Sequence, residues 1–257
     1  MARIVPLGTN GYFPSHGRHT MSFLVLGPEQ ALLLDAGTGV SRLLEPQIQE
    51  LLRPYSMLNV VVSHYHLDHV VGLAYLPAVW ARGGLRIYAP APPLVDAEPE
   101  DALDRLLAPP LFPSSWRSFG VAIEALREER SRVAAWEAHL WRQAHPGGSV
   151  GMRLGDDLAY LTDTVADPSL ASRLRGVRLL LHEVWTYDDT AGEAAAKGHS
   201  DFSAVAELVR CSQISAVMLV HHPPSRSPEE AETLAAAMAR QTRVRVLPGI
   251  EGQVYEF

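Results

Sequence analysis

A group of four potential metal ligands follows directly after a short apolar segment. The segment 58–62 reads LNVVV, and the chain then places His64, His66, Asp68 and His69 within six residues. A short, branched apolar run of this kind is typical of a buried strand. Imidazole and carboxylate groups bind zinc, and also manganese or iron. A tight turn there would let His64 and His66 share one metal ion and leave Asp68 and His69 for a second.

Segments typical of strands and of helices alternate along the chain. The expected strands are 3–7, 20–26, 31–34, 58–62, 85–88, 151–154, 157–162, 177–181, 216–220 and 243–248. The expected helices are 40–52, 70–81, 99–107, 202–211 and 228–241. The segment 132–142 is ambiguous between helix and strand. This alternation predicts an α/β protein built from layers of sheet and helix.

We expect residues 1–257 to form a single domain, because the sequence contains no repeat, linker or low-complexity tract. Residues 89–113 are rich in proline and acidic side chains. This composition predicts an irregular excursion with one short helix, and such excursions often cover a site. We therefore interpret 89–120 as a possible lid.

The composition is that of a globular protein, with 47% hydrophobic and 20% charged residues. No apolar run approaches the ~20 residues of a membrane helix, and the first residues lack the features of a signal peptide, so we expect a cytoplasmic protein. A single cysteine, Cys211, excludes an internal disulfide framework and a multi-cysteine zinc module. The formal charge of −7, with Lys197 as the only lysine, gives no general attraction to nucleic acid backbones.

The run HxHxDH resembles the defining motif of the metallo-β-lactamase superfamily. Further matches lie at Asp35 in LLLDAGTG, His145 in HPGGSVGMRL, Asp163 in YLTDT and His221 in VMLVHHPP, in the family's order. The resemblance runs nearly end to end. It implies a four-layer αββα sandwich with the site at one edge, between two sheets.

The resemblance also implies a binuclear metal site. The first ion would be held by His64, His66 and His145, the second by Asp68, His69 and His221, and Asp163 would bridge the two. Two divalent ions, Zn²⁺ or alternatively Mn²⁺ or Fe²⁺, would activate a bridging hydroxide for hydrolysis. Asp68 is assigned to catalysis as well as to metal binding, and Asp35 is expected to orient a ligand.

Two further segments resemble the ribonuclease Z and phosphodiesterase branch of that superfamily. They are LLLHEVWTYDD, with Glu183, and AKGHSDFSAVAELV, with His199. The resemblance implies that Glu183 holds His199, which stabilises the transition state or protonates the leaving oxygen. It also suggests that Arg226 grips a phosphate oxygen and that His222 lies near the pocket.

The chain departs from ribonuclease Z enzymes between the third and fourth motifs. Asp163 follows His145 by only 18 positions, which leaves no room for the long arm that grips tRNA. We therefore expect a small phosphodiester or a cyclic nucleotide as substrate, with structured RNA unsuited to the site and a homodimer as one possible assembly. Two alternatives stay open: a carboxylic ester, thioester or lactone hydrolase on the same site, and a metabolite-binding protein without turnover. The N-terminal loop residues His16 and His19 border the expected pocket without an assigned role.

Overall fold

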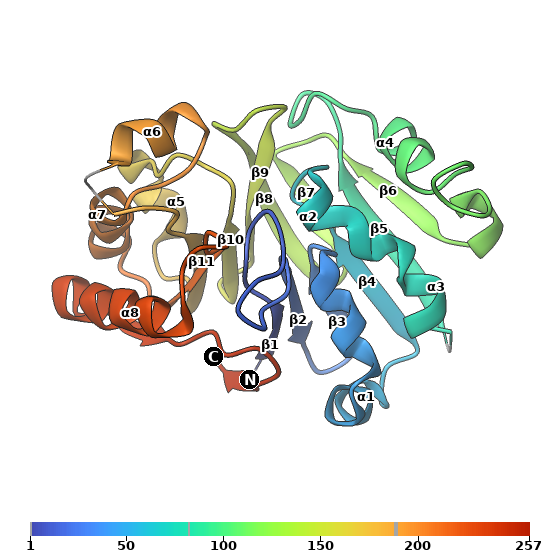
Figure 1. Ribbon diagram of the computed structural model, residues 1–257, viewed down its shortest axis with the longest axis horizontal. Helices are drawn as coiled ribbons and strands as arrows, with labels where there is room; N and C mark the ends of the chain where they lie inside the picture. The colour runs from blue at the N-terminus through green and yellow to red at the C-terminus, as the bar shows by residue number, and fades with distance from the viewer. Residues whose placement is uncertain (1, 82, 188–189) are drawn as a thin grey trace.

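Two seven-stranded sheets face each other, and helices cover the outer face of each (Figure 1). The computed structural model describes residues 2–81, 83–187 and 190–257. The strand order is β14-β1-β2-β3-β4-β5-β6 in the first sheet and β13-β12-β11-β10-β9-β8-β7 in the second. Each sheet contains both parallel and antiparallel neighbours.

The first sheet and its helices come from the N-terminal half of the chain and from the last strand. Its strands are β1 (Arg3–Gly8), β2 (Ser22–Leu26), β3 (Ala31–Leu34), β4 (Met57–Val61), β5 (Gly84–Pro90), β6 (Ala122–Leu126) and β14 (Tyr255–Glu256). Its helices are α1 (Pro46–Leu52), α2 (Leu67–Val70), α3 (Leu76–Val79) and α4 (Pro99–Leu106), with 3-10 turns at Thr38–Leu44, Val71–Ala74 and Trp116–Phe119.

The second sheet and its helices come from the C-terminal half. The strands are β7 (Arg130–Val133), β8 (Trp136–Gln143), β9 (Ser149–Leu154), β10 (Leu158–Leu161), β11 (Leu179–Glu183), β12 (Ala216–Val220) and β13 (Arg245–Leu247). The helices are α5 (Ala171–Leu174), α6 (Ala191–Ala196), α7 (Phe202–Ser212) and α8 (Pro228–Thr242), with a 3-10 turn at Pro168–Leu170. In the described ranges, no helix is long and apolar enough to cross a membrane.

Alternating side chains on the central strands build three separate apolar cores. In β3, Leu34 points into the space between the sheets, whereas Leu33 packs under the helices of the first sheet. In β11, Leu181 joins the same central core and Leu180 packs under the helices of the second sheet. This period of two is the geometry of a strand that is covered on both faces. The four-layer αββα sandwich predicted from the sequence is thereby confirmed.

The two helices expected in the first half are broken into shorter pieces. The expected helix 40–52 is a 3-10 turn that ends at Leu44, followed by α1 from Pro46. Proline has no amide hydrogen and fixes its own φ, so it begins a new helix more readily than it continues one. The expected helix 70–81 is likewise split into α2, a 3-10 turn and α3, which has a proline in its first turn. The ambiguous segment 132–142 falls mainly within β7 and β8, which pair as a hairpin.

The excursion between β5 and β6 packs on the outer face of the first sheet. It contains α4, as expected, and lies beside α3 in Figure 1. Leu103, Leu107 and Trp116 are buried in the core beneath the helices of that sheet. The segment therefore extends the helix layer.

Candidate metal centre

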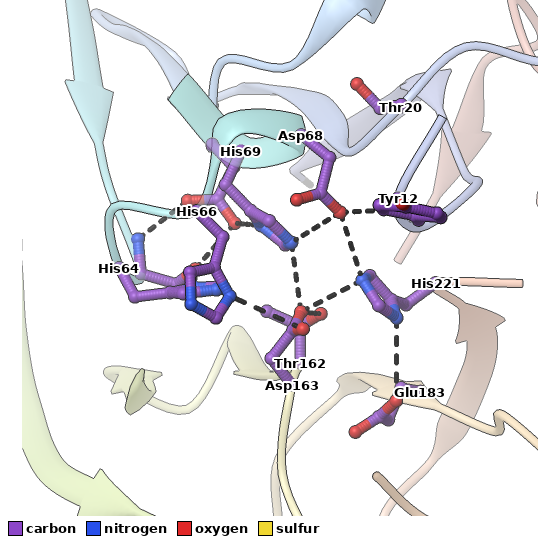
Figure 2. Close-up of polar contacts among 12 residues, drawn as sticks. Tyr12, Thr20, His64, His66, Asp68, His69, Thr162, Asp163, Glu183 and His221 are labelled. Carbon is purple, nitrogen blue, oxygen red and sulfur yellow. Dashed lines mark hydrogen bonds and ion pairs between the residues drawn. The ribbon is translucent and has the colours of Figure 1, made fainter. Parts of the chain in front are cut away.

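The site is built where the carboxyl ends of neighbouring strands meet. Asp35 follows β3, His64 follows β4, Asp163 follows β10, Glu183 ends β11 and His221 follows β12. Strands β3 and β4 are parallel, as are β10, β11 and β12. Parallel strands deliver their carboxyl ends to one edge of a sheet, so side chains far apart in sequence converge there (Figure 2).

A first group of ligand atoms surrounds one oxygen of Asp163. The group is His64, His66, His145 and Asp163, whose ligand atoms all lie within 4.8 Å of one another. The Oδ1 atom of Asp163 lies 3.3 Å from His145 Nε2 and 4.0 Å from His64 Nε2. His66 Nδ1 lies 3.0 Å from His145 Nε2.

A second group surrounds the other oxygen of Asp163. His69 Nε2 and His221 Nε2 lie 2.9 and 3.1 Å from Asp163 Oδ2. Each of these nitrogens also lies 3.4 Å from Asp68 Oδ2. Asp163 therefore turns one oxygen toward each group, which is the arrangement required of a bridging carboxylate.

The unpaired nitrogen atoms of the cluster fit metal ions. The buried Nε2 atoms of His64, His69 and His221 make no hydrogen bond within the described part of the chain, although carboxylate oxygens lie close by. Ligand atoms about 2.0–2.1 Å from a tetrahedral ion lie about 3.3 Å apart, close to the separations observed here. Lone pairs that converge at such spacing without hydrogen bonding are the arrangement expected of ligands around a cation.

Burial and neighbouring charges shift the pKa values of the side chains in the cluster. Burial opposes a charge on Asp163, but the neighbouring imidazoles, led by His221 and His69, outweigh burial and hold its pKa well below the ordinary value. Burial likewise opposes a charge on His221, but Asp163 and Asp68 outweigh burial and raise its pKa to about 10. Burial lowers the pKa of His64. The attraction between carboxylates and imidazoles thus keeps Asp163 ionised despite its burial.

Asp35 contacts His69 at Nδ1, the ring nitrogen that does not face Asp163. Its Oδ2 lies 2.7 Å from His69 Nδ1 and accepts hydrogen bonds from Ser63 Oγ and Tyr160 Oη, both at 2.7 Å. Its Oδ1 accepts a hydrogen bond from the Ser63 amide at 2.6 Å. A carboxylate that binds the far nitrogen of an imidazole fixes the ring so that its other nitrogen faces the metal. The structure therefore places Asp35 where the sequence resemblance expected an orienting residue.

Several residues of the site adopt left-handed backbone conformations. The φ angles are +65° at Tyr12, +56° at Asp35, +48° at Asp163 and +53° at His221. Such angles are uncommon outside glycine and concentrate at functional sites, because surrounding contacts must compensate for the strain. At Gly11 a methyl group would come within 2.4 Å of the His221 ring, so only glycine fits there.

Glu183 and His199 lie together at the side of the cluster. Glu183 Oε2 is 3.0 Å from His199 Nδ1 and 3.5 Å from His221 Nδ1, while its Oε1 accepts the Thr164 amide at 2.6 Å. Burial opposes the charge on Glu183, but the two histidines keep its pKa below the ordinary value. The ligand atoms of Asp163, His199 and His221 also lie within 4.8 Å of one another. The geometry thus admits His199 as a metal ligand as well as a proton donor.

A cavity of about 230 Å³ opens above the cluster. Its lining residues are Tyr12, His66, Asp68, His145, Pro146, Asp163, Trp185, Lys197, His199 and His221. Sequence reasoning assigned no site role to Tyr12, Trp185 or Lys197. Only Lys197 carried a signal, because it is the single lysine of the chain. Tyr12 donates its backbone amide to Asp68 Oδ2 at 2.6 Å, which supports that ligand from the N-terminal loop.

The structure does not bring Arg226 and His222 into this cavity. Arg226 is buried, and its guanidinium donates to the carbonyl oxygens of Val184 at 2.5 Å and Trp185 at 2.9 Å. The same group lies 3.2 Å from His222 Nδ1. Burial lowers the pKa of Arg226 to about 10 and that of His222 well below its ordinary value. Arg226 therefore holds the backbone that carries Trp185, and His222 packs against Arg226 outside the cavity lining.

Three other expected features also lie away from the cavity lining. His16 is exposed, and His19 Nδ1 lies 3.3 Å from Thr38 Oγ1. Residues 89–120 contribute no side chain to the lining formed by the described residues. The excursion borders a separate hollow of about 480 Å³, whose other wall includes Tyr65 and Leu67.

Comparison with known proteins identifies the same architecture. The model of the beta-lactamase superfamily domain matches residues 30–222. A ribonuclease Z of Metallosphaera sedula is 24% identical in an alignment that covers 86% of this chain and 88% of that protein. The metallo-beta-lactamase fold protein YhfI from Bacillus subtilis superposes with a TM-score of 0.76 at 20% identity, covering 100% of this chain and 99% of that one. A diphosphatase from the PhnP family superposes with a TM-score of 0.68 at 17% identity, covering 100% and 97%.

Proposed function

The chain belongs to the beta-lactamase superfamily, and on that premise we propose that it is a binuclear metal-dependent phosphodiesterase for small substrates. The observation that carries the proposal is the position of His199. It lines the cavity over the metal-binding cluster, and buried Glu183 binds its Nδ1 atom. The other ring nitrogen of His199 is then available to a substrate oxygen.

The donor set supports two divalent ions, with zinc the favoured metal. His64, His66 and His145 would hold the first ion, Asp68, His69 and His221 the second, and Asp163 would bind both through its two oxygens. Ions bound there supply a nucleophile from water near neutral pH and polarise the phosphoryl oxygen. Histidine and carboxylate ligands suit Zn²⁺, and also Mn²⁺ or Fe²⁺.

Glu183 and His199 would assist the departure of the leaving group. Glu183 orients His199, because the buried carboxylate accepts a hydrogen bond from Nδ1 of the ring. Protonated His199 would donate to the oxygen that departs from phosphorus. Asp68 faces both the cavity and the second ligand group, so it would bind a metal ion and also help to orient the attacking water.

Three observations favour a small substrate over structured RNA. The cavity measures about 230 Å³, which suits a phosphodiester group with a small substituent. The span from His145 to Asp163 is filled by β9 and β10, which pair as a hairpin and leave no arm for gripping RNA. The formal charge of −7 disfavours binding to a long polyanion. A relative named ribonuclease Z and a structural neighbour named a diphosphatase are consistent with chemistry at phosphorus.

A substrate panel tests the proposed reaction. Bis(p-nitrophenyl) phosphate, a cyclic nucleotide, p-nitrophenyl phosphate, a thioester, a lactone and a precursor tRNA would be assayed with the metal-loaded protein at one salt concentration. We expect turnover of the small phosphodiesters. Turnover of only the thioester or the lactone would contradict the phosphodiesterase, and efficient processing of the tRNA would contradict the small-substrate proposal.

Two variants separate metal binding from proton transfer. Asp163→Ala should abolish turnover and reduce bound metal, because the two ions lose their shared ligand. His199→Ala should keep the metal content and lower kcat by roughly 10²–10⁴, the usual range for lost acid–base catalysis. His139→Ala, at an exposed histidine on β8, is the matched control and should change neither. Equal loss of metal in the Asp163 and His199 variants would show that His199 is a ligand.

A further inference from the structure

The only lysine of the chain lines the cavity above the metal-binding cluster. Of the 22 lysine and arginine residues, Lys197 alone is a lysine. It belongs to the cavity lining together with His199 and Trp185. The proposed function assigns no role to Lys197.

The backbone around Lys197 is fixed to the cluster. Gly198, which follows it, has a φ of +79°, and its carbonyl oxygen accepts a hydrogen bond from His145 Nδ1 at 3.1 Å. A methyl group at Gly198 would lie 2.7 Å from that same ring nitrogen, so the close approach requires glycine. The backbone next to Lys197 is thus held against His145, a member of the first ligand group.

The ammonium group of Lys197 is available to a ligand. Its side chain is exposed, and within the ranges that the structure describes no carboxylate forms an ion pair with it. The nearby carboxylates are already engaged, since Asp68, Asp163 and Glu183 all contact imidazoles. A cation that lines a cavity attracts anions more strongly than one on an open surface.

An aromatic ring that lines the same cavity packs on His199. The Trp185 ring stacks on His199, with centroids 4.4 Å apart and an angle of 12° between the planes. Arg226 holds the Trp185 carbonyl oxygen at 2.9 Å, which fixes the loop. His199 is the group that would protonate the leaving oxygen, and Lys197 and Trp185 line the same cavity as His199.

We propose that Lys197 and Trp185 form a subsite for an anionic, planar leaving group, so that the preferred substrates carry a second negative charge beyond the scissile bond. This proposal rests on the proposed phosphodiesterase and deepens it. A charge-assisted hydrogen bond from the ammonium group recognises the anion, and the indole contacts a flat group beside it. The second charge would distinguish a small dianionic substrate from a simple diester.

A pair of matched esters measures this preference. Methyl 4-carboxyphenyl phosphate releases an anionic phenol, whereas methyl 4-carbamoylphenyl phosphate releases a neutral one of nearly equal shape. We expect Lys197→Gln to lower the ratio of kcat/KM for the anionic over the neutral ester about tenfold, the value of one charge-assisted hydrogen bond. Lys197→Arg should restore most of the ratio. Metal content should be unchanged in both variants.

Arg240→Gln provides the matched control. Arg240 is an exposed basic residue in the last turn of α8, as Lys197 follows the last turn of α6, but it lies outside the cavity lining. The control should leave the ratio unchanged. An equal ratio in the wild type and Lys197→Gln would overturn the subsite while leaving the phosphodiesterase intact. Failure of the wild type to hydrolyse either ester would instead count against the proposed function.

A binding measurement tests the subsite without turnover. Because the chain has one lysine, an amine-acylating reagent modifies only Lys197 and the amino terminus, and peptide mass spectrometry separates the two. In the metal-loaded protein we expect inorganic pyrophosphate to slow acylation of Lys197 several-fold and to leave the amino terminus unaffected, because one phosphate would occupy the metals and the other the subsite. Equal acylation with and without pyrophosphate would contradict the proposal.

Discussion

Side chains of the cluster are positioned by hydrogen bonds to residues that are not themselves ligands. Asp35 is buried between the sheets and accepts hydrogen bonds from Ser63 and Tyr160 in addition to its contact with His69. All of these groups are donors, so the position requires a full carboxylate. Asp35 therefore acts on metal binding through His69, although it is not a ligand itself.

Replacing this carboxylate should weaken metal binding without unfolding the protein. Asp35→Asn removes the charge and turns an amide donor toward groups that are themselves donors. We expect the affinity for divalent metal to fall about 10–100-fold, the usual effect of losing a group that orients a ligand. Competition with a chromogenic chelator measures that affinity. Asp156→Asn, at an exposed aspartate, should bind metal like the wild type, and equal affinity in both variants would exclude the orienting role.

At the level of elements, buried strands and the helices without an internal proline are predicted most accurately from the sequence. Strands such as β3 and β12 lie where expected, because continuous apolar runs mark segments that are covered on both faces. The two helical segments around Pro46 are expected as one helix, because apolar spacing does not reveal where proline restarts a helix.

The residues of the site also differ in how well the sequence predicts them. The HxHxDH motif identifies a contiguous ligand group, whereas Tyr12 and Trp185 reach the cavity from loops whose paths the sequence does not encode locally.

The N-terminus of α8 offers a test of how local contacts stabilise an element. Ser227 Oγ accepts the Glu230 amide at 3.2 Å, and Glu230 Oε2 accepts the Ser227 amide at 2.7 Å. This capping box satisfies two helix-end donors. Ser227→Ala should lower the free energy of unfolding by about 1 kcal/mol, as measured by urea denaturation. Thr233→Ala, at an exposed position of the same helix, should not destabilise the protein, and an equal loss in both variants would exclude the cap as the cause.

At the scale of the whole molecule, a buried glutamate joins the two ends of the chain. Glu251 Oε1 accepts the backbone amides of Thr9 at 2.9 Å and His19 at 3.1 Å, just before β14 pairs with β1. Arg42 lies 3.9 Å away, and Arg18 is also close enough to interact with the charge. Burial outweighs these favourable contacts and raises the pKa of Glu251 to about 7.

The raised pKa predicts a pH dependence of stability. Between about pH 4.5 and 7 the folded protein keeps a proton on Glu251 that the unfolded chain releases, so this contribution is present at low pH and is lost as the pH rises through 7. The full difference is about 3 kcal/mol. Relative to the wild type, Glu251→Gln should therefore gain about 2–3 kcal/mol in unfolding free energy between pH 5 and pH 8, whereas Glu256→Gln on β14 should gain none. A parallel pH profile for wild type and Glu251→Gln would contradict the raised pKa.

One buried aspartate, Asp163, is expected to join two metal sites. Crystals of the zinc-loaded protein, with data collected on both sides of the zinc absorption edge, test it most directly. We expect two anomalous peaks about 3.5–4 Å apart. One should lie beside His64, His66 and His145 and the other beside Asp68, His69 and His221, with one oxygen of Asp163 at each. A single peak at saturating zinc, or zinc bound only by other residues, would contradict it.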